Sequence, residues 1–495
     1  MRADLVLAID AGTTGTTALL LSHDGRVRGR GYCELPQHFP KPGWVEHDPE
    51  DLITTSQRAV HAALAAARVS AARIRCIGIT NQRETSLLWD RRTGEPVARA
   101  IVWQDRRTSE RCEELRKQGR EPLLRRLTGL RADPYFSATK IEWTLDREPL
   151  ARRLARQGRL AFGTVDSWLL WRLSGGAVHA TDPTNASRTL LFGLKSRRWD
   201  PVLMRLFGVP ASAMPDVLAS SGSFGETRGF RPLPDGIPIT GIAGDQQAAL
   251  FGQGCVRPGQ SKNTYGTGCF LLLHTGNRAV MSRAGLLTTI ACGPRGEAAY
   301  ALEGSVFVAG AAIQWLRDGL GLIESASDTE AMAKSVPDSA GVVLVPAFAG
   351  LGAPYWRPEA RGALLGLTRG VTRAHVVRAT LESLAFQSMD LVDAMARDAG
   401  APLRVLQVDG GATSNDWLMQ TQADLLGVPV RRPKVVETTA LGAGLLAGLG
   451  AGLWRSTRDL DAARRLDREF RPEQKPAWRK AERARWQDAV RRVLG

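Results

Sequence analysis

The sequence predicts an α/β protein made of two similar domains that pack around a central cleft. Apolar runs of strand length alternate with helical patterns along most of the chain, which is typical of this class. A polar entry, a Gly-Thr turn and an apolar exit run occur at 10–20 and again at 263–273, and this echo indicates either an internal duplication or a chance similarity of two Gly-rich turns. A chain of 495 residues is also too long for one ordinary core and suits two large domains.

The first elements follow from local patterns. The runs Leu5–Ile9 and Thr17–Leu21 flank a turn at 12–15, and this arrangement predicts a β-hairpin. The segment 48–51 marks a helix start, because a capping Asp precedes Pro and acidic residues complement the helix dipole. Helical periodicity then continues to Ala67. Further strands are expected at Ile74–Ile79 and Leu87–Trp89, giving a mixed sheet covered by helices.

The boundary between the domains is expected near residue 246. The run Ile237–Thr240 leads through the small residues 241–244 to Asp245, which begins an apolar-periodic stretch typical of a helix. We therefore expect an N-terminal domain over 1–246 and a C-terminal domain over 247–495. The small residues would let a ligand approach the backbone. Asp245 itself has two interpretations at such a junction, a helix cap or a general base.

Composition excludes several classes of protein. The 66 basic and 50 acidic residues give a net charge of +16, but acids are interleaved with the arginines even over 455–492. This mixture favours a solvated helical face over a nucleic-acid-binding arm, so no nucleic-acid partner is expected. No apolar run is long enough to span a bilayer, and no membrane partner is expected. The six cysteines form no Cys-x-x-Cys pair and the N-terminus does not resemble a signal peptide, which favours free thiols in the cytoplasm.

Three segments have the composition of a nucleotide site. In the two Gly-Thr turns, glycines let backbone N–H groups converge and threonine hydroxyls add donors, although ordinary hairpin turns would look the same. Asp10 lies at the end of a strand directly before the first turn, where a carboxylate is placed to hold Mg²⁺. The strand at 406–409 is followed by two glycines and a helix start at 414–415, and bare backbone there could receive a base or ribose.

A further set of residues suits a polyol. Arg83 offers a fork of donors and the adjacent Glu84 accepts, so the pair could hold neighbouring hydroxyls, or could form an internal ion pair or a solvated loop. Trp103, Tyr135 and Phe270 supply aromatic surface, which is either core or a wall against the carbon atoms of a polyol.

Taken in order, these segments resemble the glycerol kinase family, a branch of the FGGY carbohydrate kinases with the actin-like (ribonuclease H-like) ATPase fold. The resemblance rests on the segments 80–84, 100–108, 133–140, 162–168, 244–252, 263–270, 303–307, 350–356 and 408–415. It implies two duplicated actin-like domains that close around a central cleft, and ATP-dependent phosphorylation of glycerol to sn-glycerol 3-phosphate with Mg²⁺. It also implies a homodimer or homotetramer.

The resemblance assigns roles by position. Asp245 looks like the catalytic base, and Asp10 looks like the residue near Mg²⁺. The residues that look like glycerol ligands are Arg83, Glu84, Trp103, Tyr135, Asp245, Gln246 and Phe270. The residues that look like nucleotide contacts are Thr13, Thr14, Gly15, Thr17, Thr267, Gly310, Gln314, Gly411 and Asn415.

The first turn departs from the family pattern, which usually reads Asp-Gln-Gly-Thr-Thr-Ser-Ser-Arg. Here Ala11, Gly15, Thr16 and Thr17 stand in place of the Gln, the two serines and the arginine. Gly15 supplies no hydroxyl, whereas Thr16 can replace one of the two serine hydroxyls. Because Thr17 stands in place of the arginine, a positive charge near the phosphates is absent. Nucleotide affinity is therefore expected to differ from that of typical members.

Two rival functions remain at this stage. The nearer is a related carbohydrate kinase acting on a ketose or a sugar acid, although bulky Trp103 and Phe270 favour a short pocket. The other is an actin-like or nucleic-acid-binding protein without kinase activity, suggested by the net charge and the altered turn.

Overall fold

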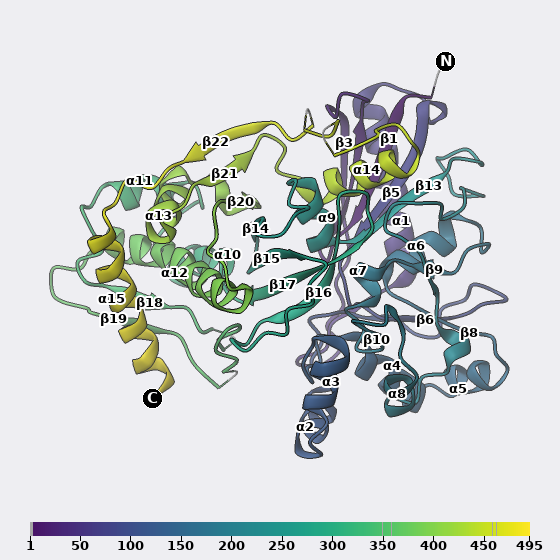
Figure 1. The fold of residues 1–495 in the computed structure, drawn as a ribbon, viewed down its shortest axis with the longest axis horizontal. Coiled ribbons are helices and arrows are strands. Elements are labelled where there is room, and N and C mark those ends of the chain that lie inside the picture. The colour runs from purple at the N-terminus through teal and green to yellow at the C-terminus, as the bar shows by residue number, and fades with distance from the viewer. Residues whose placement is uncertain (1–2, 349, 358, 458, 462) are drawn as a thin grey trace.

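The computed structural model describes residues 3–348, 350–357, 359–457, 459–461 and 463–495. Figure 1 shows two halves side by side, one built around β1, β5 and β13 and the other around β14, β15 and β20. Each half has a central sheet with helices packed against it, as expected for an α/β protein.

The first sheet has the strand order β13-β5-β1-β2-β3. Its strands are β1 Leu5–Ala11, β2 Gly15–Leu21, β3 Val27–Glu34, β5 Ile74–Asn81 and β13 Ile239–Gly244. Strands β1 and β2 form the predicted antiparallel hairpin, while β1, β5 and β13 run parallel. Helix α1, Pro49–Ala67, covers one face, and Asp48 caps it by accepting from the N–H of Glu50, as predicted.

The second sheet repeats this topology. Its order is β16-β17-β15-β14-β20-β21-β22, and the five strands β21-β20-β14-β15-β17 match β13-β5-β1-β2-β3 in order and direction. The strands are β14 Ser261–Tyr265, β15 Cys269–Gly276, β16 Leu287–Cys292, β17 Ala298–Val306, β20 Leu406–Asp409, β21 Val430–Pro433 and β22 Leu466–Phe470. The predicted duplication is confirmed at the level of strand order.

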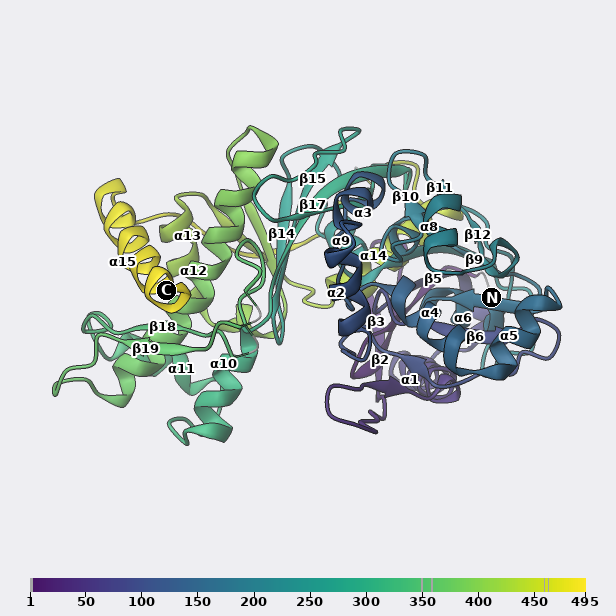
Figure 2. The same cartoon turned by 90° about the horizontal axis from the view of Figure 1, so that it is seen from below.

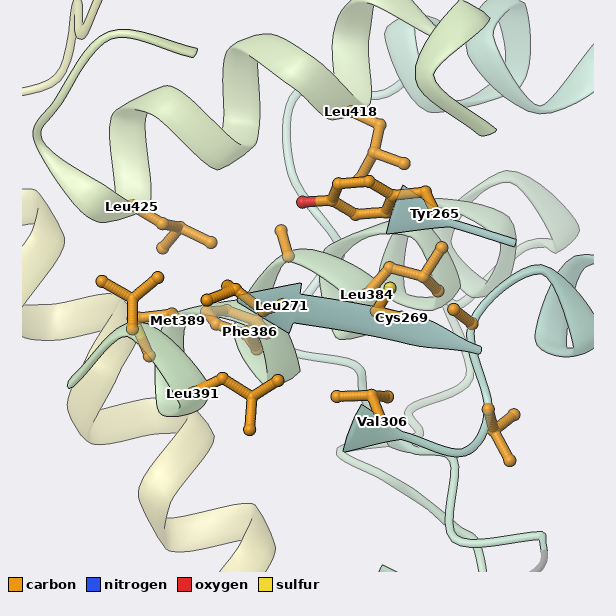
Figure 3. Close-up of a cluster of buried hydrophobic side chains, with 14 of the residues drawn as sticks. Tyr265, Cys269, Leu271, Val306, Leu384, Phe386, Met389, Leu391, Leu418 and Leu425 are labelled. Atoms are coloured by element: carbon orange, nitrogen blue, oxygen red, sulfur yellow. The ribbon is translucent and has the colours of Figure 1, made fainter. Parts of the chain in front are cut away.

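The core of the second half lies between this sheet and the helices α12 Arg373–Ala399 and α13 Asp416–Leu426. Figure 3 shows Leu271 of β15 facing Leu384 and Phe386 of α12, with Leu418 of α13 above. Burying such side chains stabilises the fold by roughly 1.5–3 kcal/mol each. The buried Tyr265 hydroxyl donates to Gln422 Oε1 at 2.6 Å, so the sheet is also tied to α13.

Two helices join the halves. Helices α9 Asp245–Gly252 and α14 Thr438–Gly450 pack on each other, and α14 lies across β5 and β13 of the first sheet (Figure 1). A Cβ at Gly241 would lie 2.5 Å from the backbone nitrogen of Ala447, so the small residue makes room for α14. The expectation that this segment leaves space for a ligand is therefore wrong at Gly241. The expected domain boundary falls within α9 and stays a prediction.

The remaining elements form a lobe beyond the first sheet and additions to the second; Figure 2 shows α4, α5 and α8 on one side and α12, α13 and α15 on the other. In the first half they are β4 Glu46–His47, β6 Leu87–Asp90, β7 Ala100–Ile101, α2 Ser109–Lys117, α3 Glu121–Thr128, α4 Ser137–Arg147, α5 Pro149–Arg156, β8 Leu160–Gly163, α6 Val165–Leu173, β9 Ala180–Thr181, α7 Pro183–Ala186, β10 Phe192–Gly193, β11 Arg198–Trp199, α8 Pro201–Leu206 and β12 Asp216–Val217. In the second they are α10 Gly310–Gln314, α11 Asp328–Lys334, β18 Val343–Val345, β19 Ala363–Leu365 and α15 Pro476–Leu494.

The cysteines are free thiols, as the sequence predicts. All six thiols are free, five of them buried and Cys33 half-buried. In the described part of the chain, no helix combines the length and the apolar character needed to cross a membrane.

Candidate active site

The floor of the site forms where two parallel strands end together. Arg83 follows β5 and Asp245 follows β13, and the Nε of Arg83 forms an ion pair with Asp245 Oδ1 at 2.9 Å. A Cβ at Gly244 would lie 2.7 Å from the Cγ of Arg83, so glycine makes room for this arginine. Gly244, not Asp245, is the N-cap of α9, which corrects the cap interpretation by one residue. Oδ1 of Asp245 also accepts from the N–H of Gln246 at 2.6 Å.

A buried network of four charges supports this floor. Both terminal nitrogens of Arg83 donate to Glu303, at 2.7 and 3.1 Å, and Arg188 bridges Glu303 at 3.0 Å and Glu84 at 2.6 Å. Burial acts to raise the pKa of Glu303, but the guanidinium charges of Arg188 and Arg83 outweigh it and bring the pKa to about 2. Two cations and two anions therefore balance inside the protein, as buried charges require.

This network changes the interpretation of the Arg83–Glu84 pair. The closest approach of Arg83 Nε to Glu84 Oε1 is 3.9 Å, and each residue makes its shorter ion pairs elsewhere. Sequence reasoning missed Glu303 and Arg188 as members of the site. One signal was available: Glu303 is a charged residue within the otherwise mostly apolar strand β17.

The three expected aromatic residues do lie together. The ring centroids of Trp103 and Tyr135 are 5.5 Å apart, and those of Trp103 and Phe270 are 6.3 Å apart, both in edge-on geometry. Arg83 donates to the Tyr135 hydroxyl at 3.3 Å, which joins the wall to the charged floor. The indole N–H of Trp103 donates to Thr13 Oγ1 at 2.8 Å, so the same wall reaches the first Gly-Thr turn.

Lys262 fixes the orientation of Gln246 and was not predicted. Its fully buried ammonium donates to Gln246 Oε1 and, at 2.6 Å, to Thr264 Oγ1. Burial lowers the pKa of Lys262, an effect partly opposed by the charges of Asp409 and Asp245. Because lysine has only donors, the amide oxygen of Gln246 must face it, and the amide NH₂ points elsewhere. Within the described residues that NH₂ makes no hydrogen bond, so it is available to a ligand.

The first turn is packed closely by its neighbours. Asp10, Thr17 and Tyr32 are register partners on adjacent strands and therefore share one face of the sheet. A Cβ at Gly15 would lie 2.5 Å from the Tyr32 hydroxyl, which donates to the carbonyl of Thr14 at 3.4 Å. Burial and then the charge of Asp245 raise the pKa of Asp10 to about 8. These two carboxylates are therefore close enough to repel each other.

Thr16 does not contribute to this face. It is fully buried, and its hydroxyl bonds to the hydroxyl of Thr55 on α1 at 3.1 Å. The expectation that Thr16 replaces one of the absent turn hydroxyls is therefore wrong, because alternate residues of a strand point to opposite faces.

A second polar network, centred on His47, supports the backbone of the first Gly-Thr turn. The buried His47 ring bonds to Gln37 Oε1 at 3.0 Å and to Gln82 Nε2 at 3.2 Å. Gln37 donates to the carbonyl of Thr13 at 2.7 Å and Gln82 to that of Gly12 at 3.2 Å. Burial lowers the pKa of His47 to about 4, so the ring is neutral at physiological pH. The backbone of the first turn is thus fixed before any ligand binds.

The second turn opens into a cavity of about 510 Å³. It brings together five of the predicted nucleotide contacts, namely Thr267, Gly310, Gln314, Gly411 and Asn415. A Cβ at Gly411 would meet no atom within 4 Å, so bare backbone faces open space there, as predicted. Asn415 caps α13 and donates to Thr329 Oγ1 at 3.2 Å. Arg317, Thr329 and Glu330 also line the cavity and were not predicted, because no motif marks their helices.

Two family models match the chain. The N-terminal domain of the FGGY family of carbohydrate kinases matches residues 5–252, and the C-terminal domain matches residues 261–451. The chain belongs to this family. Its duplicated sheets, and the cavity beside the second turn, are therefore those of an FGGY kinase.

Individual relatives show which members of the family this chain resembles. This FGGY kinase is 56% identical to a glycerol kinase of Aromatoleum aromaticum over 99% of both chains, and 55% identical to one of Symbiobacterium thermophilum over 100% of this chain and 99% of that one. The structure matches a Plasmodium falciparum glycerol kinase crystallised with ADP at a TM-score of 0.93 and 36% identity, covering 100% of this chain and 99% of that one. A gluconate kinase from Lactobacillus acidophilus shares the fold at a TM-score of 0.87 and 20% identity, over 99% and 98% of the two chains.

Proposed function

We propose that this FGGY kinase transfers the γ-phosphoryl group of ATP to glycerol, forming sn-glycerol 3-phosphate. The observation that carries the proposal is that Arg83 contacts both Asp245 and Tyr135, and that the Tyr135 ring lies against Trp103, next to Phe270. A polyol has hydroxyls for the floor and C–H faces for the wall. The full-length identity with glycerol kinases supports the same substrate.

Asp245 is the proposed proton acceptor. Arg83 and the N–H of Gln246 both engage Oδ1, and among the described residues Oδ2 makes no hydrogen bond. The free oxygen can accept the proton of a primary hydroxyl as that hydroxyl attacks the γ-phosphorus, an effect worth about 10²–10⁴ in rate. The guanidinium of Arg83 beside Oδ1 fixes the direction of the carboxylate.

The other polar groups orient the substrate. The amide NH₂ of Gln246, held by Lys262, can donate to a glycerol hydroxyl oxygen. Arg83 and Tyr135 present donors from the floor and the wall, whereas Glu84 acts by holding Arg188 and hence Glu303. Such positioning supplies much of the barrier reduction in phosphoryl transfer.

Asp10 fits a magnesium site. Its hard oxygen donors lie near the end of β1, beside the first turn, and its raised pKa indicates a carboxylate that a cation would return to the ionised form. An ion there would be held by this one carboxylate together with water and phosphate oxygens. When bound, Mg²⁺ neutralises phosphate charge. Thr13, Thr14, Gly15 and Thr17 would lie along the same phosphates.

A substrate panel tests the proposal. ADP release is measured with glycerol, a ketopentose, a ketohexose and a sugar acid, and glycerol is expected to give the highest kcat/KM. Preference for a ketose or sugar acid by more than about tenfold, a difference of about 1.4 kcal/mol, would support the related-kinase alternative. Absence of ADP release together with salt-sensitive DNA retention would support the non-kinase alternative.

The same proposal includes a cytoplasmic enzyme that forms a homodimer or homotetramer, without nucleic-acid or membrane partners. The free buried thiols support a reducing compartment. Light scattering of the purified chain measures the oligomeric state, and a monomeric mass would contradict that part.

A further inference from the structure

A second cavity, of about 660 Å³, shares no lining residue with the 510 Å³ cavity at the second Gly-Thr turn, which we propose to hold the nucleotide and call the nucleotide cavity. Strands β14 and β20 run parallel between the two cavities: they begin at the second cavity and end at the second Gly-Thr turn and at Gly410. The other walls are the end of β15, the end of α12 and the segment 255–260. That segment falls between the stretches matched by the N- and C-terminal family models, and we call it the linker segment.

The lining of this cavity is strongly basic. It includes Arg257, Arg278, Arg404 and Arg431, and no Asp or Glu. Arg431 pairs with Glu469 at 2.6 Å outside the lining. Among the described residues, the side chains of the other three arginines make no hydrogen bond or ion pair. The C-terminus of α12 contributes only about half a negative charge, so the cavity remains electropositive.

The linker holds its arginine in a fixed place. The side-chain oxygen of Gln260 accepts from the backbone N–H groups of Val256 and Arg257, at 3.0 and 2.8 Å. Gly259 donates to the carbonyl of His274 at 2.9 Å, which ties the linker turn to β15. The backbone that carries Arg257 is therefore ordered before a ligand arrives, which lowers the entropic cost of binding.

We propose that this cavity binds a small polyanion carrying phosphate groups. Unpaired guanidinium groups around a concave, acid-free site are the arrangement that recognises phosphate oxygens. The volume is that of a small-molecule site. The lining contains no Phe, Tyr or Trp on which nucleic-acid bases could stack, which favours a small ligand over a nucleic acid. The ligand would bridge Arg257 of the linker to Arg278 and Arg404 of the second half.

Calorimetric titration of the whole chain with inorganic pyrophosphate tests the site. The nucleotide cavity is first saturated with ADP, at constant ionic strength, so that failure of the nucleotide site is seen separately as absence of ADP binding. We expect one pyrophosphate per chain for the wild type. The triple variant Arg257→Gln/Arg278→Gln/Arg404→Gln should bind at least about tenfold more weakly, with an unchanged melting temperature.

A matched control removes the same charge elsewhere. Arg126, Arg153 and Arg156 are exposed residues on α3 and α5, outside both cavities. Replacing these three with Gln should leave pyrophosphate binding within about twofold of wild type, because screening weakens distant surface charges. Equal loss in both triple variants, no loss in the first, absence of binding by the wild type, or tighter retention of DNA than of pyrophosphate would each overturn the proposal.

Discussion

The two Gly-Thr turns occupy equivalent places in the duplicated sheets but have different surroundings. Trp103 bonds the Thr13 hydroxyl of the first turn, His47 supports its backbone through two glutamines, and Tyr32 covers Gly15. The second turn is open, since Gly266 and Thr267 are exposed at the 510 Å³ cavity. The duplication has therefore kept the strand order, whereas one copy carries fixed polar chemistry and the other a space for a ligand.

This difference supports the proposal that the first half carries Asp245 and the polyol contacts, whereas most of the nucleotide contacts lie in the second. Asp245→Asn tests the assignment most strongly. We expect turnover to fall about 10²–10⁴-fold, because the amide cannot accept the substrate proton. ADP binding, measured by calorimetry, should stay within about twofold, since the second turn is untouched. The exposed Asp146→Asn provides the control, and near wild-type turnover of Asp245→Asn would remove Asp245 from the reaction.

The next largest effect should come from the buried charges that support the first half. Glu303→Gln leaves Arg83 and Arg188 without their shared carboxylate, and we expect a loss of about 3–5 kcal/mol in the free energy of unfolding by urea. Glu359→Gln, which breaks an exposed pair with Arg357, should leave the free energy of unfolding nearly unchanged.

The pH dependence of the free energy of unfolding tests whether the charge of Glu303 causes this loss of stability. The pKa of Glu303 is about 2 in the folded protein against an ordinary 4.5, so the folded state favours the charged form. Its contribution to stability is complete above pH 4.5 and is lost as the pH falls toward 2. The stability difference between wild type and Glu303→Gln should therefore shrink over that interval. A difference that stays constant would show that its cause is not the charge.

Gly411→Ala tests whether the cavity at the second turn binds the nucleotide. Its added methyl meets no protein atom within 4 Å but intrudes into the nucleotide cavity. We expect KM for ATP to rise about fivefold, roughly 1 kcal/mol, while the melting temperature and kcat stay near wild type. Gly370→Ala, at another glycine with open space around it, should change none of the three. A melting temperature lowered by Gly411→Ala alone would indicate a packing role instead.

The sequence predicts the local elements of this protein, whereas it does not predict contacts between distant segments. The hairpin at Leu5–Leu21, the helix after Asp48 and the repeated turn are encoded in local patterns, and the structure has all three. Trp103, Tyr135 and Phe270 could be chosen because an aromatic set beside charged turns resembles a known family. Glu303 could not be placed, because its bond to Arg83 joins residues 220 positions apart. Only the folded chain shows which distant charges meet.

Lys262 and Tyr32 make the same point on a smaller scale. A lysine in a strand predicts an exposed residue, yet the fold buries Lys262 against Gln246. The absent serine at Gly15 predicted a changed nucleotide affinity, and nothing local indicated that the strand β3 would bring a phenol into that space. Both effects arise from the pairing of separate segments.

The smallest expected effect concerns that phenol. Because a Cβ at Gly15 would lie 2.5 Å from the Tyr32 hydroxyl, Gly15→Ser must displace the tyrosine in the wild-type background but has room in Tyr32→Ala. We expect Gly15→Ser to raise KM for ATP in the first background and to lower it in the second, where the new hydroxyl can reach the phosphates. The two substitutions should then be coupled by about 1 kcal/mol in a double-mutant cycle. Additive effects on KM would show that Tyr32 and the turn act independently, and that Tyr32 does not account for the difference between the two turns.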